Sequence, residues 1–148
     1  MSKKIAANLY LGDRYSAPTD SDLIISCAKE IFFELNAPEG ENKVISEDKK
    51  TIYYDFEDYP FIDDMDEDLI LDAIKQIENN IEDKKIYVHC VWGINRSASI
   101  VFMYMVRNKR IIAPTYETAQ QQFLEIYPNH SPNPGWAKFL KLNFPYDF

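Results

Sequence analysis

The 148-residue sequence contains only two cysteines and four glycines, and it has no long hydrophobic run. No segment reaches the ~18 apolar residues that a membrane-spanning helix requires, and no apolar stretch near the N-terminus is long enough for a signal peptide. Two cysteines are too few for a disulfide framework. These absences predict a soluble protein of the cytoplasm, or of the cytoplasm and nucleus, without a membrane partner.

Positive charge is also scarce, since the net charge is −8 and the isoelectric point is about 4.7. Such a balance provides no general basic surface for nucleic acid or an anionic membrane. A basic patch of Arg107, Lys109 and Arg110 falls at the end of an expected helix, where cations complement the helix dipole, and we favour this role over a docking site. The acidic residues cluster in a solvated loop before a helix. They are Asp55, Glu57, Asp58, Asp63, Asp64, Asp66, Glu67 and Asp68.

Short strand-like runs alternate with helical patterns along the chain. The β-branched and aromatic runs predict strands over 9–11, 23–27, 51–54 and 86–89. Helices are predicted over 67–81, 97–107, 116–126 and 135–142. The first helix has one apolar stripe, formed by Ile70, Ala73, Ile74, Ile77 and Ile81. Thr115 is placed to cap the third helix. This alternation and the length indicate one α/β domain over 1–148.

One motif carries specific chemistry. The residues from His89 to Ser97 read HCVWGINRS, which is His-Cys, five residues, Arg, Ser. At this chain's own residue frequencies, the fixed positions would coincide by chance on the order of once in a million. The motif follows a predicted strand and precedes a predicted helix. It therefore predicts a strand-loop-helix turn built around a cysteine and an arginine.

Such a turn favours a bound anion at its centre. Backbone amides of a tight loop that feeds a helix N-terminus point inward together, and the helix dipole adds to their field. The amides belong to Val91, Trp92, Gly93, Ile94, Asn95 and Arg96. Gly93 allows the backbone to approach closely where a Cβ would obstruct it. The same field favours the thiolate of Cys90 over its thiol, so Cys90 is predicted to be the nucleophile of a phosphoryl transfer.

The remaining polar residues of the motif have distinct expected roles. Arg96 offers a planar fork that holds two phosphoryl oxygens and complements their charge in the transition state. Ser97 donates its hydroxyl to the Cys90 sulfur and eases departure of the thiolate from a phosphocysteine. His89 orients the loop and does not act as a base, because a thiolate has no proton to lose.

The motif resembles the signature of the protein tyrosine phosphatase superfamily, and the chain resembles a small, atypical dual-specificity phosphatase over most of its length. Asn8 to Gly12 is similar to that family's opening strand and turn, and Ser131 to Trp136 is similar to the turn before its last helix. The resemblance implies a single-domain cysteine-phosphatase fold, with a central, mostly parallel sheet and helices on both faces. We expect no cofactor and no metal ion.

The reaction also needs an acid, because a phenolate or alkoxide leaving group must receive a proton. In the dual-specificity family this acid is an aspartate on a loop that follows a strand upstream of the signature. The resemblance assigns it to Asp58, which stands 32 positions before Cys90. Its neighbours Asp55, Asp63 and Asp64 are the alternatives.

Two features depart from the family pattern. Only residues 13–22 separate Gly12 from Leu23, where family members usually place a helix. Trp92 is bulkier than the residue more often found at its loop position. Its side chain either lines the rim of the site and stacks on a substrate ring, or packs against the sheet.

The favoured function is hydrolysis of phosphotyrosine and of phosphoserine or phosphothreonine in proteins, through a phosphocysteine intermediate. The chain has no counterpart of the extended phosphotyrosine-recognition loop of larger enzymes, which indicates a shallow pocket and dual specificity. An RNA 5′-phosphatase is the alternative, because superfamily members that act on RNA 5′ ends also carry an asparagine at the position of Asn95. The acidic charge opposes it. The sequence gives no signal for the oligomeric state.

Two other functions are less favoured. A lipid phosphatase would need basic loop residues for a multiply phosphorylated headgroup, and the loop has none besides Arg96. A non-catalytic phosphopeptide binder would have no use for an intact nucleophile and acid.

The second cysteine, Cys27, closes an apolar strand whose end is expected near the signature loop. Cys27-Ala28 resembles a Cys-Ala pair of some superfamily members, in which a second cysteine forms a disulfide with the nucleophile. A buried strand residue is the favoured interpretation of Cys27. A redox partner for Cys90 is the alternative, and it requires Cα atoms within ~7 Å.

Overall fold

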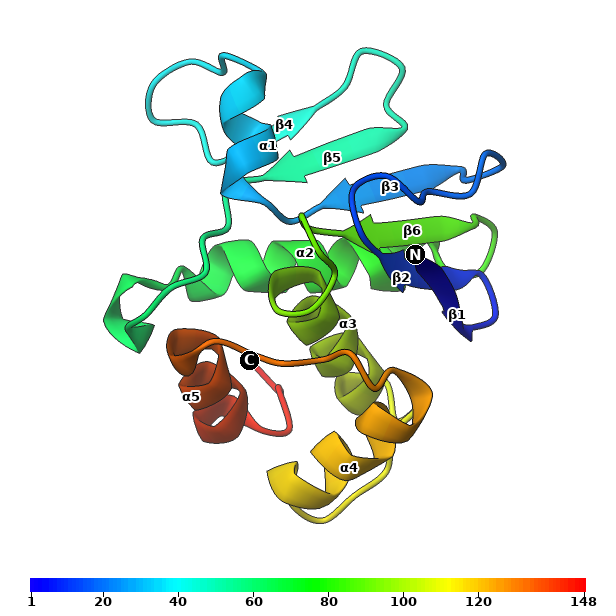
Figure 1. Ribbon diagram of the computed structural model, residues 1–148, viewed down its shortest axis with the longest axis vertical. Helices are drawn as coiled ribbons and strands as arrows, with labels where there is room; N and C mark the ends of the chain where they lie inside the picture. The colour runs from blue at the N-terminus through cyan, green and yellow to red at the C-terminus, as the bar shows by residue number, and fades with distance from the viewer.

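The computed structural model describes residues 1–148 and contains one six-stranded sheet (Figure 1). The strands are β1 (Ser2–Ala6), β2 (Leu9–Gly12), β3 (Leu23–Ser26), β4 (Lys43–Ile45), β5 (Thr51–Tyr54) and β6 (Ile86–His89), in the order β1-β2-β6-β3-β5-β4. The four central strands run parallel, and the edge strands β1 and β4 are antiparallel to their neighbours. The predicted α/β fold with a mostly parallel sheet is therefore confirmed.

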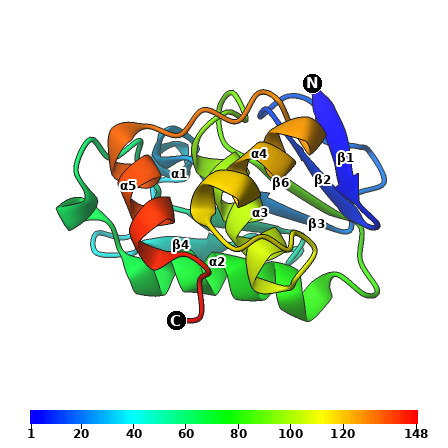
Figure 2. The ribbon, with the colours of Figure 1, turned by 90° about the horizontal axis from the view of Figure 1, so that it is seen from below.

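The helices are α1 (Lys29–Glu34), α2 (Glu67–Asn80), α3 (Arg96–Arg107), α4 (Tyr116–Ile126) and α5 (Pro134–Asn143), with a short 3₁₀ turn at Ile62–Asp64. Figures 1 and 2 show α3 at the centre of the helical layer, where it contacts α2, α4, α5 and the sheet. Every residue from Arg96 to Val106 is buried. This enclosure explains why α3 is apolar on nearly all sides. None of the helices is both long and apolar enough to cross a membrane.

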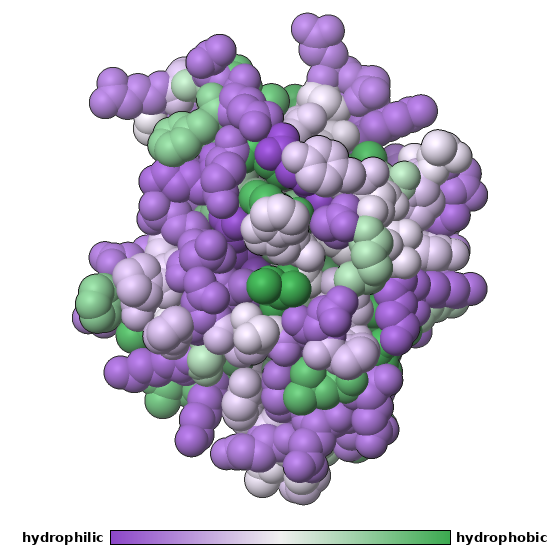
Figure 3. All heavy atoms as spheres, viewed as in Figure 1, coloured by the Kyte–Doolittle hydropathy of each residue, from purple (hydrophilic) through white to green (hydrophobic).

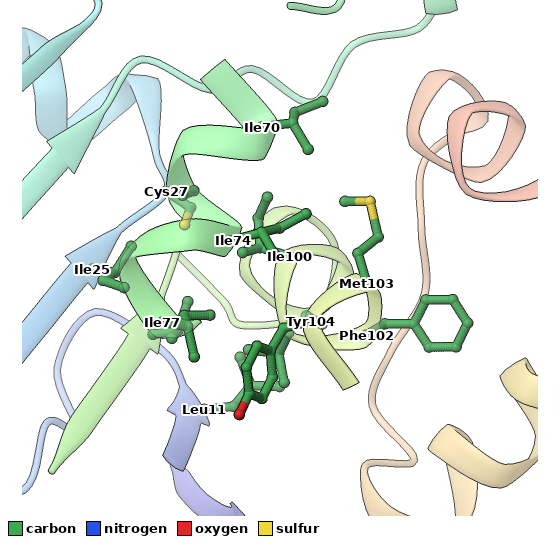
Figure 4. Packing of buried hydrophobic residues seen from close by; sticks show 14 of the residues in the cluster. Leu11, Ile25, Cys27, Ile70, Ile74, Ile77, Ile100, Phe102, Met103 and Tyr104 are labelled. Atoms are coloured by element: carbon green, nitrogen blue, oxygen red, sulfur yellow. The ribbon is translucent and has the colours of Figure 1, made fainter. Parts of the chain in front are cut away.

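The core lies between α2, α3 and one face of the sheet (Figure 4). The predicted stripe of α2 faces this core, and Ile70, Ile74 and Ile77 are completely buried there. The helix begins after Asp66, whose carboxylate accepts the Leu69 N–H. Truncating one such buried isoleucine to alanine would cost ~2–5 kcal/mol of stability. The α2 stripe therefore fixes the position of the sheet relative to α3.

The second face of the sheet is covered more sparsely. The short segment 13–22 contains no helix, and its Arg14 and Ala17 border this face as irregular backbone. The Tyr87 hydroxyl donates a hydrogen bond to the Asp13 carbonyl and ties the segment to β6. A shallow depression of about 210 Å³ remains on this face, with Ile31 of α1 on its border.

Sequence patterning missed three elements. β1 contains two lysines and β4 has three residues, so neither presents a recognisable apolar alternation. The six-residue α1 is too short for helical periodicity to show. The strand predicted over 23–27 ends one residue earlier, at Ser26. The other predicted strands and helices are present, and Thr115 caps α4 as predicted, with its hydroxyl accepting the Thr118 N–H.

The central strands β2, β6 and β3 end at the same level of the sheet. His89 pairs in register with Gly12 of β2 on one side and with Ser26 of β3 on the other. The chain leaves β6 at this level and enters α3 at Arg96. The loop between them therefore lies at the edge of the sheet where ligands bind in α/β folds.

Candidate active site

The loop from Cys90 to Asn95 is held by contacts from three distant segments. The Tyr127 hydroxyl donates to the Gly93 carbonyl at 2.6 Å, and the Ser131 N–H donates to the Ile94 carbonyl at 2.7 Å. The Arg14 N–H donates to the Val91 carbonyl at 3.2 Å. With these carbonyls turned outward and satisfied, the intervening amides are left for the interior of the loop.

Glycine is required at the turn of this loop. Gly93 has φ of +75°, in the left-handed region that other residues rarely adopt. A Cβ on Gly93 would lie 2.6 Å from the carbonyl carbon and oxygen of Gly12. The loop can therefore pack against β2 only because position 93 has no side chain.

Two donors point at the sulfur of Cys90, which is only 2% exposed. The Gly93 N–H donates to Sγ at 3.3 Å, and the Ser97 hydroxyl donates to it at 3.2 Å. Hydrogen bonds of this kind are stronger when the acceptor is charged. The arrangement therefore gives Ser97 the contact with the Cys90 sulfur that the sequence predicted.

Arg96 is buried, and hydrogen bonds to Glu30 and Phe56 hold its guanidinium group. Its Nη1 and Nη2 donate to the two carboxylate oxygens of Glu30 at 2.6 and 3.1 Å, and Nη1 also donates to the Phe56 carbonyl at 3.0 Å. Its Nε makes no hydrogen bond within the protein. The bonds from Arg96 lower the pKa of the Glu30 carboxyl. The guanidinium is thus fixed in orientation and keeps N–H groups for a phosphate.

We expect Glu30→Gln to lower kcat/KM about two- to tenfold, because it removes the charge of a half-exposed partner while keeping its shape. Arg96→Lys should cost more, since one ammonium cannot replace the fork. Steady-state kinetics on a phosphopeptide measures both. Glu57→Gln is the matched control, because Glu57 lines the same groove but pairs with Lys29 at 2.6 Å. Equal losses in the Glu30 and Glu57 variants would contradict a specific hold on Arg96.

Asp58 lies at the mouth of the loop, with its side chain 51% exposed. Its Oδ1 accepts the Asn95 side-chain N–H at 2.7 Å and lies 3.2 Å from the Arg96 Nε. Both groups lie against the same oxygen, and Oδ2 accepts no hydrogen bond from the protein. Asn133 completes the arrangement, since its backbone N–H donates to the Asn95 Oδ1 and its side chain donates to the Asp58 carbonyl.

The three alternative aspartates lie elsewhere. Asp55 lines a different cavity, beside α1, and burial raises its pKa. Asp63 and Asp64 are exposed in the 3₁₀ turn. Among the four candidates, Asp58 lines the pocket that contains Cys90.

His89 contacts the loop through its imidazole ring. Its Nδ1 lies 2.9 Å from the Cys90 carbonyl oxygen, to which it donates, and its ring stacks on Tyr87. Burial lowers the pKa of His89, which keeps the ring neutral near pH 7. These contacts fit the orienting role predicted for His89.

The pocket at the centre of the loop is small, about 70 Å³. It is lined by Asp58, Cys90, Trp92, Ile94, Asn95, Arg96 and Asn133. Trp92 is 69% exposed and Ile94 is 41% exposed, so both lie at the rim; the alternative in which Trp92 packs against the sheet is wrong. Figure 3 shows apolar and pale side chains near the centre of this face, surrounded by hydrophilic ones. No group of three or more His, Cys, Asp or Glu is placed to hold a metal ion.

The comparisons with known proteins agree on the family. The model for the catalytic domain of dual specificity phosphatases matches residues 9–142, which run from β2 into α5. The chain belongs to the dual-specificity phosphatase family. Among curated protein sequences, none matches this chain.

Several solved structures share the fold at low sequence identity. DUSP15 is 20% identical, with a TM-score of 0.72 over 99% of this chain and 88% of its own. Human DUSP28 is 17% identical, with a TM-score of 0.70 over 95% of this chain and 90% of its own. The human tyrosine phosphatase-like serine/threonine/tyrosine-interacting protein is 20% identical, with a TM-score of 0.71 over 95% and 93%.

Sequence reasoning missed three residues of this dual-specificity phosphatase site. Glu30, Tyr127 and Asn133 come from separate elements and meet the loop only in the folded chain. Asn133 could have been predicted, because the turn from Ser131 to Trp136 is similar to the corresponding turn of the family. Nothing in the sequence pattern marks Glu30 or Tyr127.

Cys27 packs in the core (Figure 4), at the end of the strand that neighbours the one preceding Cys90. Ser26 and His89 pair in register, so Cys27 and Cys90 follow at adjacent strand ends, and the Cys27 N–H donates to the His89 carbonyl at 2.7 Å. In-register parallel strands direct paired side chains to the same face. The pKa of the Cys27 thiol is raised well above its usual value, first by burial and then by the nearby Cys90. Both thiols are free.

This placement predicts reversible protection against oxidation. Peroxide converts the Cys90 thiolate to a sulfenic acid, and the Cys27 thiol then displaces water to form a disulfide that dithiothreitol reduces. After peroxide and dithiothreitol, activity should return in the parent but much less in Cys27→Ser. Equal recovery in the two proteins would leave Cys27 with its packing role alone.

Proposed function

We propose that this chain is a cysteine-dependent phosphatase that hydrolyses phosphotyrosine and phosphoserine or phosphothreonine in proteins, through a phosphocysteine intermediate. One observation carries the proposal: Cys90, Arg96 and Asp58 line a single pocket of about 70 Å³. A thiol, a buried guanidinium and a carboxyl group supply the nucleophile, the phosphate clamp and the proton donor of one reaction.

In the first step the phosphoryl group enters the loop, where the inward amides and Arg96 neutralise its oxygens. The Cys90 thiolate attacks phosphorus, so an S–P bond forms as the P–O bond to the leaving group breaks. Asp58 transfers the proton of Oδ2 to the departing oxygen. Asn95 and Arg96 both contact Oδ1. They therefore stabilise the carboxylate that remains and leave Oδ2 accessible.

In the second step a water molecule attacks the phosphocysteine. Asp58, now ionised, takes a proton from this water, and the S–P bond breaks to release inorganic phosphate. The departing sulfur regains the hydrogen bonds from Ser97 and Gly93, at 3.2 and 3.3 Å in the resting protein. These bonds stabilise the thiolate as a leaving group.

The exposed rim of the pocket supports action on both classes of phosphoprotein. It includes the exposed side chains of Trp92 and Ile94. A phosphate on a short serine or threonine side chain can therefore reach the loop, as can one on tyrosine.

The RNA 5′-phosphatase alternative loses its main support. Asn95 invited that comparison, but its contacts with Asp58 and Asn133 explain its presence. The adjoining groove carries the carboxylates of Glu30, Glu57 and Asp58. These charges would repel the backbone of an RNA chain.

Phosphate release from three substrates tests the proposal: a phosphotyrosine peptide, a phosphothreonine peptide of the same sequence, and a 5′-triphosphorylated RNA. We expect turnover of both peptides and slower turnover of the RNA. A preference for the RNA would favour the alternative, and binding of the peptides without any phosphate release would favour a phosphopeptide-binding module.

A further inference from the structure

Trp92 is one of the large apolar side chains that the fold leaves exposed. The chain has two tryptophans, and the other, Trp136, is completely buried. The Trp92 ring has no aromatic neighbour and takes no part in the core, although it stands directly on the rim of the pocket that holds Cys90. Its position at the pocket distinguishes it from the other exposed apolar side chains, because a group that enters the pocket passes the indole.

The position of Trp92 limits what can cover it. Cys90, Asn95 and Arg96 make the floor of the pocket polar, so a phosphate occupies the floor and the group that carries it passes the rim. Trp92 and Ile94 provide apolar surface at that rim. A serine or threonine phosphate offers only one or two carbons there, too few to cover an indole. A tyrosine phosphate places a whole ring against it.

We propose that Trp92 is an aryl platform that stacks on the substrate ring and biases this site toward phosphotyrosine. The inference rests on the proposed function and deepens it by ranking the substrates. A nucleobase is the less favoured occupant, because the adjoining groove has three carboxylates and its one lysine, Lys29, is already paired with Glu57.

Kinetics tests the platform with a matched pair of peptides that differ only in phosphotyrosine or phosphothreonine. In Trp92→Ala the ratio of kcat/KM for phosphotyrosine over phosphothreonine should fall about three- to tenfold, the factor expected for one aromatic pair. Trp92→Phe should keep most of the ratio. Ile112→Ala is the control, since Ile112 is similarly exposed but lies beyond the C-terminal end of α3, in a different cavity, and it should leave both activities unchanged.

Fluorescence gives a second readout, because Trp136 is buried and binding at the rim perturbs Trp92. In Cys90→Ser, the phosphotyrosine peptide should change the indole emission and the phosphothreonine peptide should not. The change should vanish in Cys90→Ser combined with Trp92→Phe.

Four results would overturn the platform. An equal loss on both peptides in Trp92→Ala would assign Trp92 to the general shape of the loop. A response to a 5′-phosphorylated oligonucleotide but not to the phosphotyrosine peptide would assign the platform to RNA. If the parent hydrolysed neither peptide, the proposed function would fail together with this inference. If the parent hydrolysed both peptides and Trp92→Ala left the ratio of kcat/KM values unchanged, only the platform would be contradicted.

Discussion

Replacing Cys90 with serine should abolish turnover while leaving the binding of phosphate analogues intact. The amides of the loop, the fixed Arg96 and the rim all remain in that variant, but the nucleophile becomes an alcohol that is scarcely ionised at neutral pH. Isothermal titration with a phosphopeptide measures binding, and phosphate release measures turnover. We expect Cys90→Ser to retain binding and to lose turnover.

Cys27→Ser is the matched control for that experiment. Cys27 is also buried and lies at the end of the adjacent strand, yet no group of the loop donates a hydrogen bond to its sulfur. It should keep its turnover under reducing conditions. Substantial turnover in Cys90→Ser would contradict covalent catalysis by Cys90.

Asp58→Asn should lower kcat by ~10²–10⁴ on phosphothreonine and other alkyl phosphates, because an amide cannot protonate the leaving oxygen. The loss should shrink with substrates whose leaving groups depart without a proton. Rates measured across a series of leaving groups check this dependence.

The neighbouring aspartates supply the controls. Asp55→Asn, Asp63→Asn and Asp64→Asn change the same charge by the same chemistry at positions outside the pocket. Each should retain a kcat close to that of the parent. If one of them reproduced the dependence on the leaving group and Asp58→Asn did not, the assignment of the acid would be wrong.

The sequence predicted the parts of the molecule whose cause is local. The spacing of Cys90 and Arg96 requires a loop, and short apolar runs on either side require a strand and a helix. The stripe of α2 could be read from its periodicity, and the distance from Asp58 to Cys90 was informative through the family resemblance. In each case the deciding residues are close in the chain or belong to one recognisable motif.

What the sequence could not predict depends on tertiary contacts. Glu30 meets Arg96 from 66 positions away, and Tyr127 meets Gly93 from 34 positions away. The edge strands β1 and β4 form because the neighbouring strands offer free hydrogen-bonding groups, whatever their weak intrinsic propensity. The exposure of Trp92 likewise follows from how the loop docks against β2, which a single sequence does not encode in a local pattern.

The phosphocysteine intermediate is the central claim, and trapping it is the most direct measurement. The protein would be mixed with a phosphotyrosine peptide, quenched in acid during turnover, digested and analysed by mass spectrometry. The account predicts one added phosphoryl group on the fragment that contains Cys90, absent in Cys90→Ser. Turnover that proceeds with no phosphoenzyme, or with the phosphoryl group on another residue, would contradict it.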